Sequence, residues 1–274
     1  MSDQVPLLSG GVPRINRITI DQPWDWLAAG WADLRAAPAV GFGYGALFVA
    51  AGFVALALMW VWDIFALFLP LAGGFLLVAP VLAVGLYETS RRLAAGEPTS
   101  MRLALTAWRR NLGQVALLGV ALLLFFIAWM RLASLIFMLF FAYDPPAPDS
   151  FIQHVFFRWD SIPFLLVGCG IGAVLATLVF AITVVSVPML LDRDVNVVVA
   201  IATSVEAVRQ NPFPMFVWAC LIVLFTGAGL ATGYLGLIIT LPIVGHASWH
   251  AYRDLVAPAT ASEAAALSGR ESLA

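Results

Sequence analysis

The sequence predicts an all-α fold, a polytopic membrane helical bundle, because two observations, its composition and its long apolar runs, point to lipid as its solvent. Hydrophobic residues make up 62% of the 274-residue chain and charged residues 11%, whereas soluble domains hold about 45–50% and about 25%. Apolar runs of about 20 residues, enough to cross a bilayer, recur along the chain. All fourteen basic residues are arginine. This composition excludes a soluble globule, a disordered chain and a disulfide-rich module, and the net charge of −2 excludes a nucleic-acid binder.

Six transmembrane helices are expected from the apolar runs. These runs are 40–62, 64–86, 113–130 with an apolar extension to 141, 163–191, and a stretch from 213 to 252 that holds two crossings. The first two runs are separated only by Asp63, so the chain must turn back near this residue, because the combined run is too long for one span. Gly229, Gly233 and Gly236 mark the turn between the last two.

The arginines predict the orientation of the bundle. Twelve of them lie before the first span, between spans two and three, between spans four and five, or after the sixth. Only Arg131 and Arg158 fall on the other side. Because cytoplasmic loops carry the excess of basic residues, both termini are expected in the cytoplasm. The first 20 residues lack the charged segment and apolar stretch of a cleavable signal peptide.

Three hairpin repeats are predicted within a membrane domain of residues 21–256, at about 24–93, 98–193 and 198–255. At an offset of 174, apolar residues before the first span align with apolar residues before the fifth, and at an offset of 74 they align less closely with residues before the third. Their i, i+3, i+7, i+10 spacing predicts amphipathic surface helices. An outward insertion, 131–161, interrupts the middle repeat, and residues 1–20 and 257–274 are expected to be disordered tails.

Three segments resemble one known family. They are 85–92 (GLYETSRR), 187–195 (VPMLLDRDV) and 245–253 (GHASWHAYR), and they are similar to the bacterial integral membrane family called domain of unknown function 2189. The resemblance spans roughly residues 18–256 and implies a multi-pass protein of the bacterial inner membrane with no established activity. Some family members are labelled as cytochrome c oxidase subunit I. A haem–copper catalytic subunit needs about six histidine ligands, and this chain has three histidines.

His246 and His250 are candidate ligands because they stand four residues apart on one face, at the cytoplasmic end of the sixth span. Such a pair can hold a metal or haem iron. Ala247 occupies the position where a zinc protease carries its glutamate. Asp254 lies about 12 Å along the helix from His246, too far to share an ion with it, although it could orient His250. The favoured interpretation is a polar interfacial cap, so the sequence predicts no metal and no cofactor.

Arg131 is a second candidate. It lies about 27 Å along its helix from Gly113, near the outer interface. There its guanidinium could snorkel toward lipid headgroups, or it could pair with Asp63 or Asp160 in an outer polar cavity.

Charged residues at the cytoplasmic ends of two spans form a third group. Asp192, Arg193 and Asp194 end the fourth span and are expected to fix a loop by local ion pairing. Together with Arg91, Arg92, Arg109 and Arg110, they could instead form a docking surface for another protein or for anionic lipid headgroups.

Glycines recur at 41, 43 and 45 in the first span and at 168, 170 and 172 in the fourth. Small residues let helices approach closely in lipid. Close packing within the chain and a homo-oligomer through these glycine faces are both compatible with this pattern.

The sequence favours a non-catalytic interaction or assembly protein, placed beside a respiratory complex, because no catalytic constellation is found. The expected partners are the lipid bilayer and a membrane-protein complex. A small-solute or lipid permease is the alternative, favoured by the repeats and by the prolines within the spans.

Overall fold

The computed structural model describes residues 13–62, 64, 67–144, 146–147 and 149–258. The helices in this part are α1 (Gln22–Ala36), α2 (Pro38–Val61), α3 (Phe68–Leu82), α4 (Val84–Ala94), α5 (Met101–Leu105), η3 (Ala107–Asn111), α6 (Leu112–Phe141), α7 (Phe151–Phe156), η4 (Trp159–Ser161), α8 (Ile162–Thr183), α9 (Ser186–Asp192), α10 (Val197–Gln210), α11 (Pro212–Ala231) and α12 (Leu237–Leu255). Over these residues the only strand-like pairing is one isolated bridge, between Ile15 and Val256. The predicted all-α fold is therefore confirmed.

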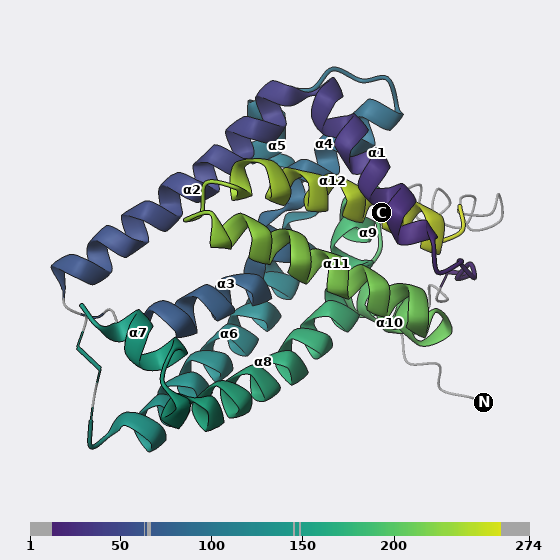
Figure 1. Ribbon diagram of the computed structural model, residues 1–274. Coiled ribbons are helices and arrows are strands. Elements are labelled where there is room, and N and C mark those ends of the chain that lie inside the picture. The colour runs from purple at the N-terminus through teal and green to yellow at the C-terminus, as the bar shows by residue number, and fades with distance from the viewer. Residues whose placement is uncertain (1–12, 63, 65–66, 145, 148, 259–274) are drawn as a thin grey trace, which may run out of the picture.

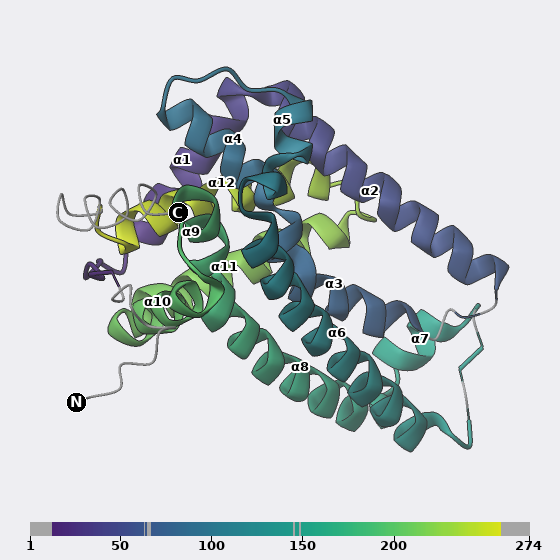
Figure 2. The same ribbon diagram turned by 180° about the vertical axis from the view of Figure 1, so that it is seen from behind.

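The helices converge at one end of the molecule and diverge toward the other. Figure 1 shows α1, α4, α9, α10 and the C-terminal part of α12 gathered at one end, while α2, α3, α6 and α8 run away from it toward α7. Figure 2 shows the same arrangement from behind, with α2 separated from α3, α6 and α8 at the far end. We call the converging end, made of residues 22–36, 84–111, 186–210 and 243–255, the packed end.

Five segments are long and apolar enough to cross a membrane: Pro38–Val61, Pro70–Ala94, Ala107–Phe141, Trp159–Asp192 and Pro212–Ala231. Helix α12 is not among them. Its first half is apolar, but its second half carries His246, Ser248 and His250, which lower its mean hydropathy. The membrane-protein prediction is confirmed by the five segments, and the sixth crossing stays a prediction.

Exposed tryptophans mark both ends of the bundle. Trp24, Trp31 and Trp108 lie at the packed end, and Trp60, Trp62 and Trp159 lie at the opposite end, all at least 40% exposed. Tryptophan is enriched at both membrane–water interfaces because its ring is apolar and its N–H is polar. The two groups are therefore placed where a membrane protein carries its aromatic belts.

Two of the long apolar segments are interrupted before they end. Ala83 separates α3 from α4, and Val184 and Val185 separate α8 from α9. Pro188 has no N–H to donate to the carbonyl four residues earlier, at Val184, so the helix cannot continue through it regularly. At the interruption the Val185 N–H donates to a side chain of α10, Ser204 Oγ, at 3.1 Å.

The two segments beyond these interruptions form the core of the packed end together with the second half of α12. We call α4, α9 and residues 243–255 of α12 the exit helices; they contact one another. Residues 84–90, 186–191 and 245–249 are buried without exception. Each exit helix is covered by a helix that precedes a long apolar segment: α12 by α1, α4 by α5 and η3, and α9 by α10. We call these covering helices the entry helices.

The three junctions between an entry helix and the following long helix share one backbone conformation. They are Ala37 (φ −128°, ψ 58°), Asn111 (φ −143°, ψ 59°) and Asn211 (φ −128°, ψ 52°). These positions are separated by the offsets of 74 and 174 residues at which the sequence aligns with itself.

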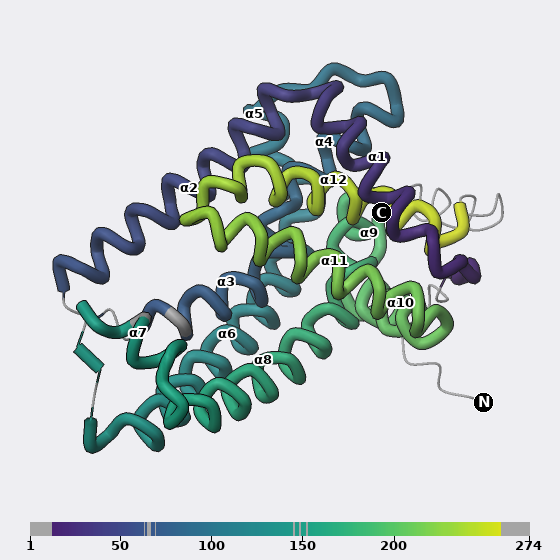
Figure 3. The backbone as a smooth tube through the Cα atoms, viewed as in Figure 1, coloured from purple at the N-terminus to yellow at the C-terminus, as the bar shows by residue number. Residues whose placement is uncertain are grey.

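The two ends of the described chain lie side by side at the packed end (Figure 3). Asn16 N–H donates to the Leu255 carbonyl at 2.8 Å, and Ala257 N–H donates to the Arg14 carbonyl at 3.0 Å. Residues 13–20, which the sequence assigns to a disordered tail, are therefore held against the C-terminal end of α12. Most of both expected tails, 1–12 and 259–274, lies outside the described residues.

Candidate functional site

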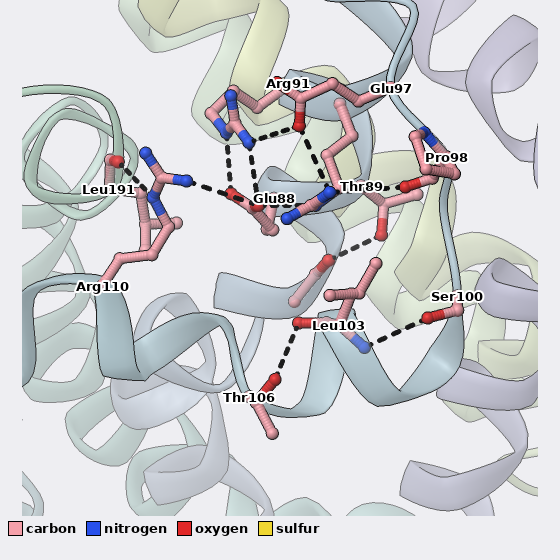
Figure 4. Close-up of polar contacts among 12 residues, drawn as sticks. Glu88, Thr89, Arg91, Glu97, Pro98, Ser100, Leu103, Thr106, Arg110 and Leu191 are labelled. Carbon is pink, nitrogen blue, oxygen red and sulfur yellow. Dashed lines mark hydrogen bonds and ion pairs between the residues drawn. The ribbon is translucent and has the colours of Figure 1, made fainter.

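A buried carboxylate forms the centre of the polar contacts on α4. Glu88 is 2% exposed and accepts hydrogen bonds from Arg91 Nε at 2.8 Å and Arg92 Nε at 2.7 Å (Figure 4). The two arginines follow Glu88 by three and four residues, so helical geometry places both on its face. A third guanidinium, that of Arg110, lies 3.8 Å from the same carboxylate.

This cluster joins three elements of the packed end. Arg91 and Arg92 also contact the Glu97 carboxylate, at 3.1 and 3.2 Å, just after α4. Arg110 comes from η3 and donates through Nε to the Leu191 carbonyl of α9 at 3.3 Å. The predicted residues Arg91 and Arg92 are thus engaged with acids of their own segment, and they are only partly exposed.

The two candidate histidines contact different helices. His246 is fully buried, and its Nδ1 lies 2.8 Å from Ser90 Oγ of α4. Its Nε2 has no hydrogen-bond partner within the described residues. His250 Nε2 lies 2.9 Å from Asp33 Oδ2 of α1. The described part of the chain contains no group of three or more His, Cys, Asp or Glu residues that could hold a metal ion.

Asp33, and not Asp254, is the carboxylate that orients His250. Asp254 accepts hydrogen bonds from Trp26 Nε1 at 2.8 Å and from Gln22 Nε2 at 3.1 Å. Because α1 packs directly on α12, it supplies hydrogen-bond partners to both His250 and Asp254 of α12. The orienting role expected of Asp254 therefore belongs to Asp33, on a different helix.

The residues that end the fourth span are tied to α12. The Tyr252 hydroxyl donates to Asp192 Oδ2 at 2.6 Å and accepts from Arg193 Nε at 3.0 Å. Arg193 also donates to the Ala257 carbonyl at 2.6 Å, whereas its distance to Asp192 is 4.0 Å. Asp194 is exposed. These side chains therefore fasten α9 to α12 more closely than they pair with one another.

Arg131 lies exposed on α6, and within the described residues no carboxylate lies within ion-pair distance of it. Asp160 is 3.5 Å from Arg158 instead. Asp63 lies outside the described residues, so its predicted pairing with Arg131 stays a prediction.

The glycine faces of the two spans differ in what surrounds them. A Cβ atom on Gly45 would lie 2.5 Å from the Ile238 carbonyl oxygen of α12, so α2 uses this glycine for packing within the chain. Gly41 likewise faces Leu34. On α8, Gly168 and Gly170 have open space at the Cβ position. A homo-oligomer through glycines therefore stays a prediction for α8.

Sequence reasoning missed Glu88, Ser90 and Asp33 as parts of the polar contacts. The sequence does contain a signal for Glu88. Arg91 and Arg92 follow it by three and four residues, a spacing that favours ion pairs on a helix, and only 11% of the residues in this chain are charged. Asp33 had none, since its partner His250 is 217 residues away.

The comparisons with known proteins gave one match, to a family model that covers part of the chain. Residues 67–192, from just before α3 to the end of α9, match the family model described as "Predicted integral membrane protein (DUF2189)". The resemblance is confirmed over this stretch, which is slightly less than half of the chain and contains Glu88, Arg91, Arg92 and Asp192. The segment 245–253 lies outside it. Neither the curated proteins nor the solved structures gave a match.

Proposed function

We propose that this chain is a non-catalytic interaction or assembly protein of the bacterial inner membrane. One observation carries the proposal: the carboxylates at the packed end are bound by side chains of the same chain. Glu88 is held by arginines, Asp33 by His250 and Asp192 by Tyr252. Because these contacts fix the side chains within the chain, the packed end would offer another membrane protein a rigid surface to bind.

The proposed topology has six crossings, built as three hairpin units, with the packed end in the cytoplasm. Three features support it. The entry junctions at Ala37, Asn111 and Asn211 share one conformation, each entry helix covers an exit helix, and the two ends of the described chain are hydrogen-bonded together. In this topology twelve of the fourteen arginines lie on the side of the packed end. The positive-inside rule assigns that side to the cytoplasm.

The partner we propose is a membrane-protein complex, with a respiratory complex as the first class to examine. Co-purification of the tagged chain in mild detergent, followed by mass spectrometry and an absorption spectrum, tests this proposal. We expect the subunits of one membrane-protein complex in near-equal amount to the chain. Recovery of the chain alone in repeated preparations would contradict the proposal, and a haem band in chain recovered without a partner would favour a ligand role for His246.

The chain offers a matched pair of variants for this experiment. Exposed tryptophans are frequent binding hot spots, and two pairs lie at opposite ends. Replacing Trp24 and Trp31 of α1 by alanine is expected to reduce partner recovery, because they lie at the packed end. Replacing Trp60 and Trp62 at the far end should leave it unchanged. Equal losses would show that the tryptophans act only through the membrane.

The interruptions at Ala83 and at Val184–Val185 favour a second candidate, the small-solute or lipid permease, because transporters use broken helices at their binding sites. The shallow hollow on α8 lined by Ala173, Val174, Thr177 and Leu178 is mostly apolar and open, which lends no support to a polar pathway. Liposomes containing the protein and a fluorescent phospholipid separate the two functions. Lipid movement between leaflets no faster than in protein-free liposomes agrees with the interaction protein, and acceleration would favour the permease.

A further inference from the structure

The three entry helices differ sharply in charge. Helix α1 carries two aspartates and one arginine, and α10 carries one glutamate and one arginine. The segment of α5 and η3, residues 101–111, carries Arg102, Arg109 and Arg110 and no acid. We call residues 101–112 the arginine segment. Structural packing alone gives no reason for this difference, because all three entry helices cover an exit helix.

The arginine segment also carries the side chains of a helix that lies in the membrane interface. Leu105, Trp108 and Leu112 are 44%, 40% and 52% exposed, although all three are large and hydrophobic. The Trp108 N–H is satisfied by the Leu105 carbonyl at 3.0 Å. These side chains are suited to the acyl chains just below the headgroups, which places the neighbouring guanidinium groups at headgroup level.

The positive charge of this segment is not neutralised by the protein. Arg102 and Arg109 are exposed, and within the described residues neither has a carboxylate within ion-pair distance. The Arg109 guanidinium lies 5.3 Å from the centre of the Trp108 ring instead. Arg110 is 3.8 Å from Glu88, but Arg91 and Arg92 already occupy this carboxylate at shorter distances.

We propose that the arginine segment binds the headgroup of an anionic phospholipid. Guanidinium groups bind phosphate oxygens through paired hydrogen bonds, and the exposed Leu105, Trp108 and Leu112 would contact the acyl chains of the same lipid. Charge complementarity selects an anionic lipid over a zwitterionic one. This inference does not depend on the proposed protein partner.

Native mass spectrometry of the purified protein tests the proposal, with phosphatidylglycerol and phosphatidylcholine added in equal amounts. The test variant is R102Q/R109Q, which leaves the Glu88 contacts of Arg110 in place. The control is R35Q/R209Q, because Arg35, Arg109 and Arg209 occupy equivalent positions: Arg109 and Arg209 follow Arg35 by 74 and 174 residues. Arg35 also lies 5.8 Å from the ring of Trp31, so the control removes the same kind of contact.

The wild type and R35Q/R209Q are expected to prefer phosphatidylglycerol, and R102Q/R109Q is expected to lose roughly tenfold or more of that preference. Equal binding of both lipids by the wild type, or equal losses in both variants, would overturn the proposal. Displacement of the lipid by millimolar inorganic phosphate would also overturn it, in favour of a free-phosphate site. If R102Q/R109Q elutes as an aggregate, the single variant R109Q replaces it with the same expectations.

Discussion

Glu88→Gln is expected to reduce the free energy of unfolding by about 1.5–3 kcal/mol, the usual contribution of a hydrogen bond to a charged group, because Arg91 and Arg92 keep Glu97 as a second partner. Glu88 is 2% exposed, and its carboxylate accepts from two guanidinium groups that are themselves only 14% and 19% exposed. The neutral amide cannot balance these charges. The cost is measured as the shift in unfolding of the detergent-solubilised protein under heat or increasing sodium dodecyl sulfate.

The matched control is Glu97→Gln, which removes a carboxylate that contacts the same two arginines but is 41% exposed. Exposed pairs contribute about 0–1 kcal/mol, so this variant is expected to unfold close to the wild type. Similar unfolding of the two variants would mean that the buried cluster does not hold α4, η3 and α9 together.

Gly45→Ala is expected to destabilise the bundle by about 1–3 kcal/mol, the usual cost of overpacking. The added Cβ would lie 2.5 Å from the Ile238 carbonyl oxygen and 2.7 Å from its Cα. These are backbone atoms of α12, so no side-chain rotation can relieve the contact, and α12 must move away from α2. Since α12 also contacts α1, α4 and α11, the displacement is expected to spread through the packed end.

Gly43→Ala provides a control two residues away in the same helix. There the new Cβ would meet only the terminal methyl of Met101, which is flexible. Gly170→Ala on α8 meets no atom within 4 Å. Alanine has a higher helix propensity than glycine by about 1 kcal/mol, so both controls are expected to be neutral or slightly stabilising. A Gly45→Ala protein as stable as these would show that α2 and α12 are not in close contact.

The fold class could be predicted from the sequence because lipid imposes a simple rule: a spanning helix is a run of apolar residues of fixed length. The helices α2, α6 and α11 follow this rule. Helix α12 departs from it, because its second half is buried among protein groups rather than lipid. His246 and Ser248 can be there because Ser90 and the Val244 carbonyl supply partners.

The contacts of the candidate site were harder to predict for a related reason. Arg91 and Arg92 are predictable from the sequence because the positive-inside pattern places them at the cytoplasmic end of a span. Their acid, Glu88, lies on the same helix, but this helix is covered by η3 and by α9, and α9 is distant in the sequence. Likewise, the bond between Asp33 and His250 exists only once α1 covers α12. Periodicity reports which face of a helix is apolar, and it does not report which helix covers that face.

The proposed topology has six crossings and a cytoplasmic packed end, and labelling of single cysteines tests both features. Single cysteines, introduced into a protein in which Cys169 and Cys220 are replaced by alanine, can be tested with a membrane-impermeant maleimide on spheroplasts. Suitable exposed positions at the packed end are Thr19 and Pro258, near the two ends of the described chain.

Asp149 and Leu235 are the exposed positions for the opposite side, and Leu235 lies in the turn between α11 and α12. We expect labelling at 149 and 235 in intact spheroplasts, and labelling at 19 and 258 only after the membrane is opened. Protection of 235 together with labelling of 149, or labelling of 19 and 258 from opposite sides, would contradict this topology.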